Sequence, residues 1–302
     1  TMRLAIPRET HPGENRASVT PETVKKLVRL GADLAIEAGA GAGAGFSDEA
    51  YAAEGASVVT DRDALLGSAD MVLRLRKPEL EEVAKLKAGC IHVSYLDPFN
   101  EHELIREFAA KSITAVSMEM IPRSTRSQKM DALSSQANLA GYMAVMLAAT
   151  RLPRIFPMMM TPAGTLKPSK VFIIGAGVAG LQAIATAKRL GARVTAFDTR
   201  PVVAEQVQSL GGKFLEIDLG DTGQTADGYA RELTPEQVEI QRQAQKAVIA
   251  DSDVVITTAQ VFGRKPPVLV TADMVAGMAP GSVVVDMAAE TGGNVEGSVP
   301  DE

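Results

Sequence analysis

The segment from Lys170 to Asp198 constrains the fold more than any other part of this sequence. It contains an apolar strand pattern, the motif Gly175-Ala176-Gly177-Val178-Ala179-Gly180, a helical pattern and a second apolar strand pattern that ends in an acid. In a βαβ unit the first glycine permits a tight turn, the second lets a pyrophosphate approach the backbone, and the third lets the helix pack on the strand. We therefore expect a Rossmann dinucleotide-binding domain that begins at Lys170.

The acid at the end of the second strand bears on the choice of dinucleotide. Asp198 can accept hydrogen bonds from the adenosine ribose hydroxyls and would repel a 2′-phosphate, which predicts NAD(H) rather than NADP(H). Arg200 follows two residues later and could accommodate a 2′-phosphate, so these residues leave the strength of the preference open. The helix that starts after Gly177 would offer free N–H groups and the positive end of its dipole to the phosphates.

Strand and helix patterns alternate along both halves of the chain. A helix is expected to begin at Pro21, with Thr20 as its cap, and another covers residues 101–110. The expected strands are residues 3–7, 34–37, 71–75, 91–95 and 113–117 in the first half, and 171–174, 193–197, 213–215, 254–257 and 282–286 in the second. Such alternation predicts an α/β fold of two doubly wound parallel-sheet domains, the second being the Rossmann dinucleotide-binding domain.

The passage between the two domains is expected at residues 129–169. An apolar helical pattern covers residues 130–150, and four prolines follow it. Residues 1–128 are therefore assigned to an N-terminal α/β domain, and residues 170–302 to the Rossmann domain. A chain of 302 residues is long enough to form two domains, each with its own core.

Charge and cysteine usage exclude several classes of function. The net charge is −6 and no run of lysine and arginine occurs, which argues against binding to nucleic acid. The single cysteine, Cys90, cannot form an intramolecular disulfide and is expected to be buried and inert in a reducing, cytoplasmic compartment. The three histidines lack metal-ligand spacing, so no metal site is expected. The most apolar stretch, residues 138–149, is shorter than the roughly 20 residues that span a bilayer.

A dense group of polar residues precedes the expected connecting helix. Gln128, Asp131 and Ser135 have the spacing i, i+3, i+7 and are expected to share one helical face. Arg123 would lie in a loop just upstream. Taken alone, these residues favour a capped helix start with a solvated salt bridge, and a binding site is the alternative.

This polar group and the glycine segment together resemble the NAD(H)-binding component of proton-translocating NAD(P)+ transhydrogenases, within the wider alanine dehydrogenase-like group. The resemblance runs from Met2 to about Asn294. It includes the motifs Pro7-Arg8-Glu9, Glu14-Asn15-Arg16, Ser134-Ser135-Gln136-Ala137-Asn138-Leu139-Ala140-Gly141-Tyr142, Gly228-Tyr229-Ala230 and Thr257-Thr258-Ala259.

The resemblance implies a set of residues around a bound dinucleotide. The residues that match positions around the nicotinamide, and to which we give catalytic roles, are Arg123, Gln128, Asp131 and Ser134. The residues that match cofactor-binding positions are Arg126, Gly175, Gly177, Val178, Ala179, Gly180, Asp198, Thr199, Arg200, Gly228, Tyr229, Gln241, Thr258 and Gln260. In family members the position of Tyr229 lies on a mobile loop that closes over the site. The polar, glycine-containing composition of residues 220–232 agrees with a loop there.

Alanine dehydrogenase is the alternative within the same group. Its lysine and its acid–base histidine correspond here to Arg76 and Asp97, so the proton carrier of oxidative deamination is missing. Lys77 could replace the lysine, whereas His92 is interpreted as structural. Hydride exchange between two nicotinamides moves no substrate proton and needs only that the rings are juxtaposed and shielded from water. A non-enzymatic NAD(H)-sensing module is a second alternative.

The function that the resemblance implies is hydride transfer between NAD(H) on this chain and NADP(H) on a separate component, coupled to proton translocation by a membrane component. The chain would be enzymatically active only with those partners, would form a homodimer, and would lie in the cytoplasm, peripherally on the inner face of the membrane. Family members continue after the Gly292-Gly293 turn with another strand and a returning helix, so the second domain is expected to lack its C-terminal end. The run Met158-Met159-Met160 is interpreted as adaptable core or interface packing.

Overall fold

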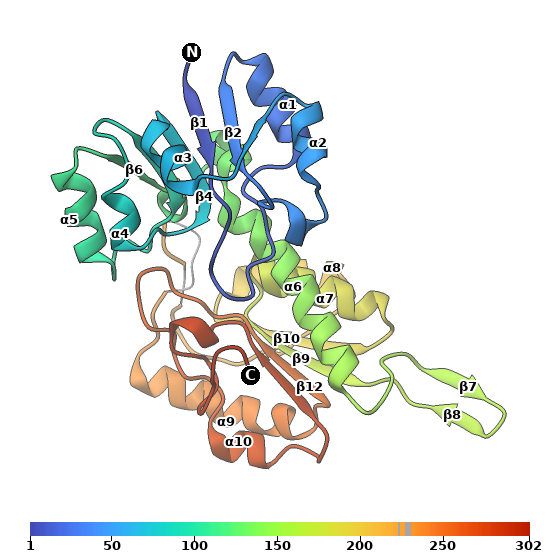
Figure 1. The fold of residues 1–302 in the computed structure, drawn as a ribbon. Coiled ribbons are helices and arrows are strands. Elements are labelled where there is room, and N and C mark those ends of the chain that lie inside the picture. Colours follow the sequence, from blue (N-terminus) through green and yellow to red (C-terminus); the bar gives the residue numbers. More distant parts are fainter. Residues whose placement is uncertain (223, 227–230) are drawn as a thin grey trace. The chain divides into compact units, whose positions relative to one another are not determined.

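The computed structural model describes residues 1–222, 224–226 and 231–302. These residues form two compact units, Thr1–Asp131 and Ala132–Glu302. Each unit is an α/β structure built on a parallel sheet, as the alternation of strand and helix patterns predicts (Figure 1).

The first unit contains a six-stranded sheet in the order β3-β2-β1-β4-β5-β6, and all its strand pairs are parallel. Its strands are β1 (Arg3–Ile6), β2 (Asp33–Glu37), β3 (Ser57–Val59), β4 (Met71–Arg76), β5 (Ile91–Tyr95) and β6 (Thr114–Ser117). Its helices are α1 (Pro21–Arg29), α2 (Asp48–Ala53), α3 (Arg62–Ser68), α4 (Leu80–Val83) and α5 (His102–Ala110), with short 3-10 segments η1 (Ala42–Ala44), η2 (Met118–Met120) and η3 (Thr125–Met130). The strand order reverses between β1 and β4, which makes their carboxyl ends the switch point of this sheet.

Both faces of the first sheet are covered, because side chains along a strand alternate between the faces. Ala5 of β1 packs in a cluster with Leu65 of α3 and Phe108 of α5. Its neighbour Ile6 belongs to a second cluster, with Val24 of α1. The prediction of a sheet with helices on both sides is confirmed.

The second unit contains a five-stranded parallel sheet in the order β11-β10-β9-β12-β13. Its strands are β9 (Lys170–Ile174), β10 (Arg193–Phe197), β11 (Lys213–Phe214), β12 (Val254–Thr257) and β13 (Val283–Asp286). Its helices are α6 (Ala132–Arg151), α7 (Val178–Arg189), α8 (Ala204–Ser209), α9 (Pro235–Ala250) and α10 (Ala272–Ala276), with 3-10 segments η4 (Pro201–Val203) and η5 (Ala289–Thr291). The order is that of the first five strands of a Rossmann domain.

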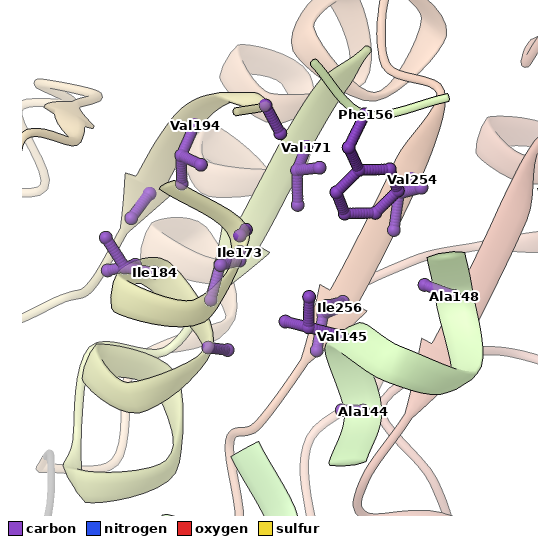
Figure 2. Packing of buried hydrophobic residues seen from close by; sticks show 14 of the residues in the cluster. Ala144, Val145, Ala148, Phe156, Val171, Ile173, Ile184, Val194, Val254 and Ile256 are labelled. Atoms are coloured by element: carbon purple, nitrogen blue, oxygen red, sulfur yellow. The ribbon is translucent and has the colours of Figure 1, made fainter. Parts of the chain in front are cut away.

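Helices also cover both faces of the second sheet. Figure 2 shows one face, on which Ile184 of α7 lies near Ile173 of β9 and Val145 of α6 lies beside Ile256 of β12. On the other face, Ile249 of α9 packs in a cluster with Phe172 of β9. This layered packing holds β9, and therefore the glycine turn that follows it, in the middle of the unit.

The connecting region differs from its sequence interpretation. Helix α6 belongs to the second unit, and the chain divides after Asp131. The Pro-rich stretch contains an antiparallel hairpin, β7 (Met159–Thr161) with β8 (Gly164–Leu166). Met160 is 81% exposed, so the interpretation of the methionine run as core is wrong. None of the helices in the described part of the chain has the length and apolar character that crossing a bilayer demands.

Candidate functional site

The carboxyl ends of β9 and β12 meet where the strand order of the second sheet reverses. The chain leaves β9 through Gly175, whose φ is +100°. Thr258, which follows β12, donates a hydrogen bond from Oγ1 to the Gly175 carbonyl oxygen at 3.0 Å. Ligands of open α/β sheets bind outside the carboxyl ends of the strands at such a reversal. The turn that was predicted from the glycine motif therefore lies where a nucleotide site is expected.

The three glycines of the motif have different surroundings. A Cβ atom on Gly175 would overlap Thr258 Oγ1, and a Cβ on Gly180 would overlap the Gly175 carbonyl oxygen. A Cβ on Gly177 would meet only Arg200 Nη2, at 3.9 Å. Gly175 and Gly180 are thus required by packing, whereas the space over Gly177 is open. An open position between two packed ones fits the close approach of a bound pyrophosphate.

Helix α7 begins immediately after this open position. Gly177 is its N-cap residue and makes no side-chain capping bond, and the first turn contains Val178 and Ala179, both half-buried. The first N–H groups of a helix have no acceptor within the helix. They and the helix dipole would therefore be available to phosphate oxygens in front of α7.

Asp198 lies just after β10, next to this turn, and is buried. Its Oδ2 accepts hydrogen bonds from the Ala176 N–H at 2.8 Å and from Arg200 Nη2 at 3.0 Å. Its Oδ1 accepts from the Arg200 N–H at 2.8 Å and from Arg200 Nε at 3.0 Å. The predicted ribose-binding acid therefore lies beside the glycine turn, and its charge is already paired with the Arg200 guanidinium.

Thr199 and Arg200, which follow Asp198, form hydrogen bonds with two residues of the predicted loop. Thr222 Oγ1 donates to the Thr199 carbonyl oxygen at 2.7 Å, and Arg200 Nη1 donates to Gln224 Oε1 at 3.5 Å. The predicted cofactor-binding residues Gly228 and Tyr229 lie outside the described residues.

Two more of the predicted cofactor-binding residues lie in the same unit, one on α9 and one after β12. Gln241 on α9 is 1% exposed, and its Oε1 has no hydrogen-bond partner in the described part of the chain. Gln260 is exposed and donates from Nε2 to the Met287 carbonyl oxygen at 2.6 Å. A buried amide oxygen without a donor is costly, and this unsatisfied acceptor distinguishes Gln241 from the exposed Gln260.

The polar group before α6 is arranged differently from the sequence prediction. Gln128 lies in η3, whose start is capped by Ser124, and Asp131 ends η3 with ψ of 81°. Helix α6 begins only at Ala132, so the prediction that Gln128 and Asp131 share a face of that helix is wrong. The Ser127 backbone N–H donates a local hydrogen bond to Ser124 Oγ, and this competing bond favours the 3-10 turn.

The structure brings some of these predicted residues together. Arg123 Nε lies 3.6 Å from Asp131 Oδ2, while Arg126 and Gln128 are exposed. Ser134 lies in the first turn of α6 and belongs to the second unit. The first unit therefore presents a guanidinium, a carboxylate and an amide within nine residues of chain.

A network of paired charges lies at the switch point of the first sheet. It includes Glu14 and Arg16 of the motif Glu14-Asn15-Arg16. Glu14 forms a two-bond pair with Arg16, each bond being 2.8 Å long, and also accepts from Arg76 Nε at 2.9 Å. These bonds, with that to Arg16 the strongest, hold the pKa of Glu14 at about 2. The Glu14 carboxyl therefore stays ionised and neutralises part of the charge of both arginines.

Lys77, which follows β4, is paired with acids as well. Lys77 Nζ lies 2.5 Å from Glu101 Oε1 and 3.8 Å from Asp97 Oδ2. Asp97 has φ of +49°, an uncommon conformation for a residue other than glycine.

His92 is 1% exposed in the core of the unit, in agreement with its structural interpretation. Burial lowers its pKa to about 3, so the His92 imidazole is neutral at pH 7.

Comparison with known proteins gives a consistent result for both units. Models described as "Alanine dehydrogenase/PNT, N-terminal domain" and "Alanine dehydrogenase/PNT, C-terminal domain" match residues 5–140 and 144–302. The chain is 46% identical to an NAD(P) transhydrogenase subunit alpha protein of Rhodospirillum rubrum, over 99% of this chain and 80% of that protein. It is 30% identical to alanine dehydrogenase of Bacillus subtilis, over 98% of this chain and 72% of that protein. A transhydrogenase structure from Sinorhizobium meliloti matches with a TM-score of 0.89 at 46% identity, over 98% of this chain and 80% of that one.

Proposed function

This chain belongs to the alanine dehydrogenase/PNT family, and on that premise we propose that it is the NAD(H)-binding component of a proton-translocating NAD(P)+ transhydrogenase. The observation that carries the proposal is the glycine turn at the switch point of the second sheet, with open space over Gly177 and the buried acid Asp198 beside it. The higher identity to a transhydrogenase subunit than to an alanine dehydrogenase, 46% against 30%, supports the choice within the family.

The charge network of the first unit supports the same choice. An amino-acid dehydrogenase needs cationic groups for the substrate carboxylate and a proton carrier for deamination. Arg16 and Arg76 both bond to Glu14, and Lys77 bonds to Glu101. Asp97 occupies the position that the resemblance assigns to the histidine, and its backbone N–H bonds to Glu119. These pairings leave little free positive charge for an amino acid at that edge.

Hydride exchange requires that two nicotinamides are bound, oriented and shielded from water. The bound NAD(H) supplies the hydride chemistry. Gly177 and the start of α7 would hold the pyrophosphate, and Asp198 and Thr199 would hold the adenosine ribose. Arg123 and Asp131, which form an ion pair, would orient the carboxamide end of the nucleotide. The resemblance also assigns Ser134 to the nicotinamide end, and Gln128 would be directed to the second nucleotide.

The second nucleotide, NADP(H), would be bound by a separate component, because the described residues of this chain contain one glycine turn of this kind. A membrane component would couple the exchange to proton movement, and this chain would associate with the inner face of the membrane through those partners. We also propose that two copies of the chain pair as a homodimer. The hairpin β7–β8 supports this, since Met158, Met160 and Leu166 on and beside it are 63%, 81% and 46% exposed.

The proposed function is tested by adding an NADP(H)-binding transhydrogenase component to the purified chain. NADH should bind alone, and hydride should pass between NADH and an NADP+ analogue only in the mixture. Gln128→Ala should keep NADH binding and lower the rate of hydride transfer at least about tenfold. A misplaced nicotinamide ring would lengthen the distance between the two reacting carbon atoms. The exposed Lys129→Ala is the matched control. Transfer at the normal rate by Gln128→Ala would disprove the juxtaposition role, and NADH binding without any transfer would indicate a sensing module.

The homodimer is tested at the hairpin. Replacing Met160 and Leu166 together by lysine should weaken self-association about 100-fold, because burial of each side chain contributes roughly 1.5 kcal/mol or more. Sedimentation equilibrium measures the dissociation constant. Leu30→Lys, at a position that is 84% exposed in the first unit, serves as the control. An unchanged dissociation constant in the double variant would place the dimer contact elsewhere.

A further inference from the structure

The pairing of Asp198 with Arg200 carries an inference that deepens the proposed function and rests on it. We infer that Arg200 sets how strongly this site discriminates NAD(H) from NADP(H): it neutralises the ribose-binding acid and must release it when the ribose binds. The sequence alone leaves open how Asp198 and Arg200 together set this preference. The structure shows that this charge is not free to act on a nucleotide.

Asp198 accepts four hydrogen bonds within the protein. A carboxylate has about four acceptor positions. Two are filled by backbone N–H groups, those of Ala176 and Arg200, both at 2.8 Å. The other two are filled by Nε and Nη2 of the Arg200 side chain, both at 3.0 Å. Every acceptor position of this acid is therefore occupied before a nucleotide arrives.

Burial makes the pair stronger than a surface ion pair. The side chains of Asp198 and Arg200 are 5% and 11% exposed, and the two parallel bonds form the geometry that guanidinium and carboxylate groups prefer. The adenosine ribose of NAD(H) carries two hydroxyl groups that can donate to a carboxylate. If the guanidinium leaves, two acceptor positions open, which equals the number of ribose donors. The two backbone bonds would remain and keep the acid in place.

The same pair changes the response to a 2′-phosphate. A free Asp198 would repel that group, because two negative charges a few ångströms apart repel each other strongly in a partly buried site. With Arg200 attached, the local charge is zero and the guanidinium lies where it can bond to a phosphate. The pair therefore reduces the discrimination against NADP(H) that the acid alone would give.

The experiment measures dissociation constants of NADH and NADPH by nucleotide fluorescence for the wild type and Arg200→Met. The methionine keeps the apolar length of the arginine stem and removes the charge and the donors. Loss of Arg200 removes both its competition for Asp198 and its own contacts, so the readout is the ratio of the NADPH constant to the NADH constant. We expect this ratio to rise at least about tenfold, because Asp198 becomes an unpaired anion that repels a 2′-phosphate. In the Arg200→Met background, Asp198→Asn should abolish this gain in selectivity.

Arg264→Met is the matched control, since Arg264 pairs with Glu232 in the same unit and both side chains are more than half exposed. It should change neither constant. If Arg200→Met is too unstable to assay, Arg200→Gln removes the charge while keeping a donor, and the same change in selectivity is expected. Equal weakening of both nucleotides, or an unchanged ratio, would overturn the inference and make Arg200 a general phosphate contact. Failure of the wild type to bind NADH would instead overturn the proposed function.

Discussion

Replacing Gly177 by alanine is expected to weaken NADH binding about 100-fold and to leave the second unit folded with nearly unchanged stability. The added methyl group meets only Arg200 Nη2, at 3.9 Å, so the protein itself accommodates it. Gly177 has φ of −78° and ψ of −163°, a conformation that alanine adopts without strain. The methyl group would instead occupy the space assigned to the pyrophosphate, and overpacking of that kind costs roughly 1–3 kcal/mol.

Gly180→Ala is the matched variant from the same motif, and it should behave in the opposite way. Its methyl group would overlap the carbonyl oxygen of Gly175, which is backbone and cannot rotate away. Helix α7 would have to move from the turn, so the free energy of unfolding of the second unit should fall by about 1–3 kcal/mol or more. Urea unfolding of each variant, together with NADH titration in the absence of denaturant, separates the two effects.

The two variants together locate the nucleotide. Weak binding by a stable Gly177→Ala protein means that the open space over this residue is used by the ligand. Normal binding by that protein would mean that the pyrophosphate lies elsewhere, and the assignment of the site to this turn would be wrong. Loss of stability in both variants would show that Gly177 also serves packing, contrary to its surroundings in the structure.

The layered fold could be predicted because it depends on patterns that are local in sequence. The continuous apolar runs of β9 and β12 predict parallel strands that are buried on both faces, and Val254 and Val255 do pack on opposite faces of the sheet. The glycine motif marks the turn between strand and helix, and its backbone requirement is visible as the positive φ of Gly175. Each of these signals lies within a few residues of the feature it predicts.

Short and exposed elements were not predicted, because their stability comes from partners that are distant in sequence. Strand β3 has three residues, lies at the edge of its sheet beside β2, and is largely exposed. The hairpin β7–β8 includes Met160 and lies in a stretch whose prolines suggested a linker. Neither element has the apolar run that identifies a buried strand.

The structure corrects the predicted geometry in one part of the candidate site. The spacing of Gln128 and Asp131 suggested a helical face, but the Ser124 cap favours a 3-10 turn, and propensity alone does not weigh that competing bond. Likewise, the sequence predicts Asp198 and Arg200 as two separate nucleotide contacts. Only the structure shows that the backbone turn after β10 brings them together as a buried pair.

Mild acid should destabilise the first unit through one buried group, His92. The imidazole is buried, its Nε2 has no hydrogen-bond partner among the described residues, and the Phe108 ring lies 5.1 Å away. Burial, reinforced by the charge of Arg74, lowers its pKa from 6.5 to about 3, although Glu82 opposes this shift. The unfolded chain therefore binds a proton at this residue at a higher pH than the folded chain does.

The sign of the effect follows from this difference. A group with a depressed pKa in the folded state contributes stability above its unfolded pKa and loses that stability as the pH falls toward its folded pKa. For His92 the loss begins near pH 6.5 and continues to about pH 3. Between pH 7 and pH 5 it should reach about 2 kcal/mol. Glu14, whose pKa is held at about 2 instead of 4.5, adds its loss only below about pH 4.5.

His92→Leu should therefore remove most of the decline between pH 7 and pH 5, although the substitution also changes the packing in the core. The measurement is amide hydrogen exchange of residues 91–95, corrected for the intrinsic effect of pH, because a chain of two units need not unfold in one step. His102→Leu, at an exposed position at the start of α5, is the control and should keep the wild-type slope. If the His92→Leu protein loses protection as steeply as the wild type, the acid sensitivity of the first unit arises elsewhere. The paired acids that neutralise its arginines would then be the groups to test.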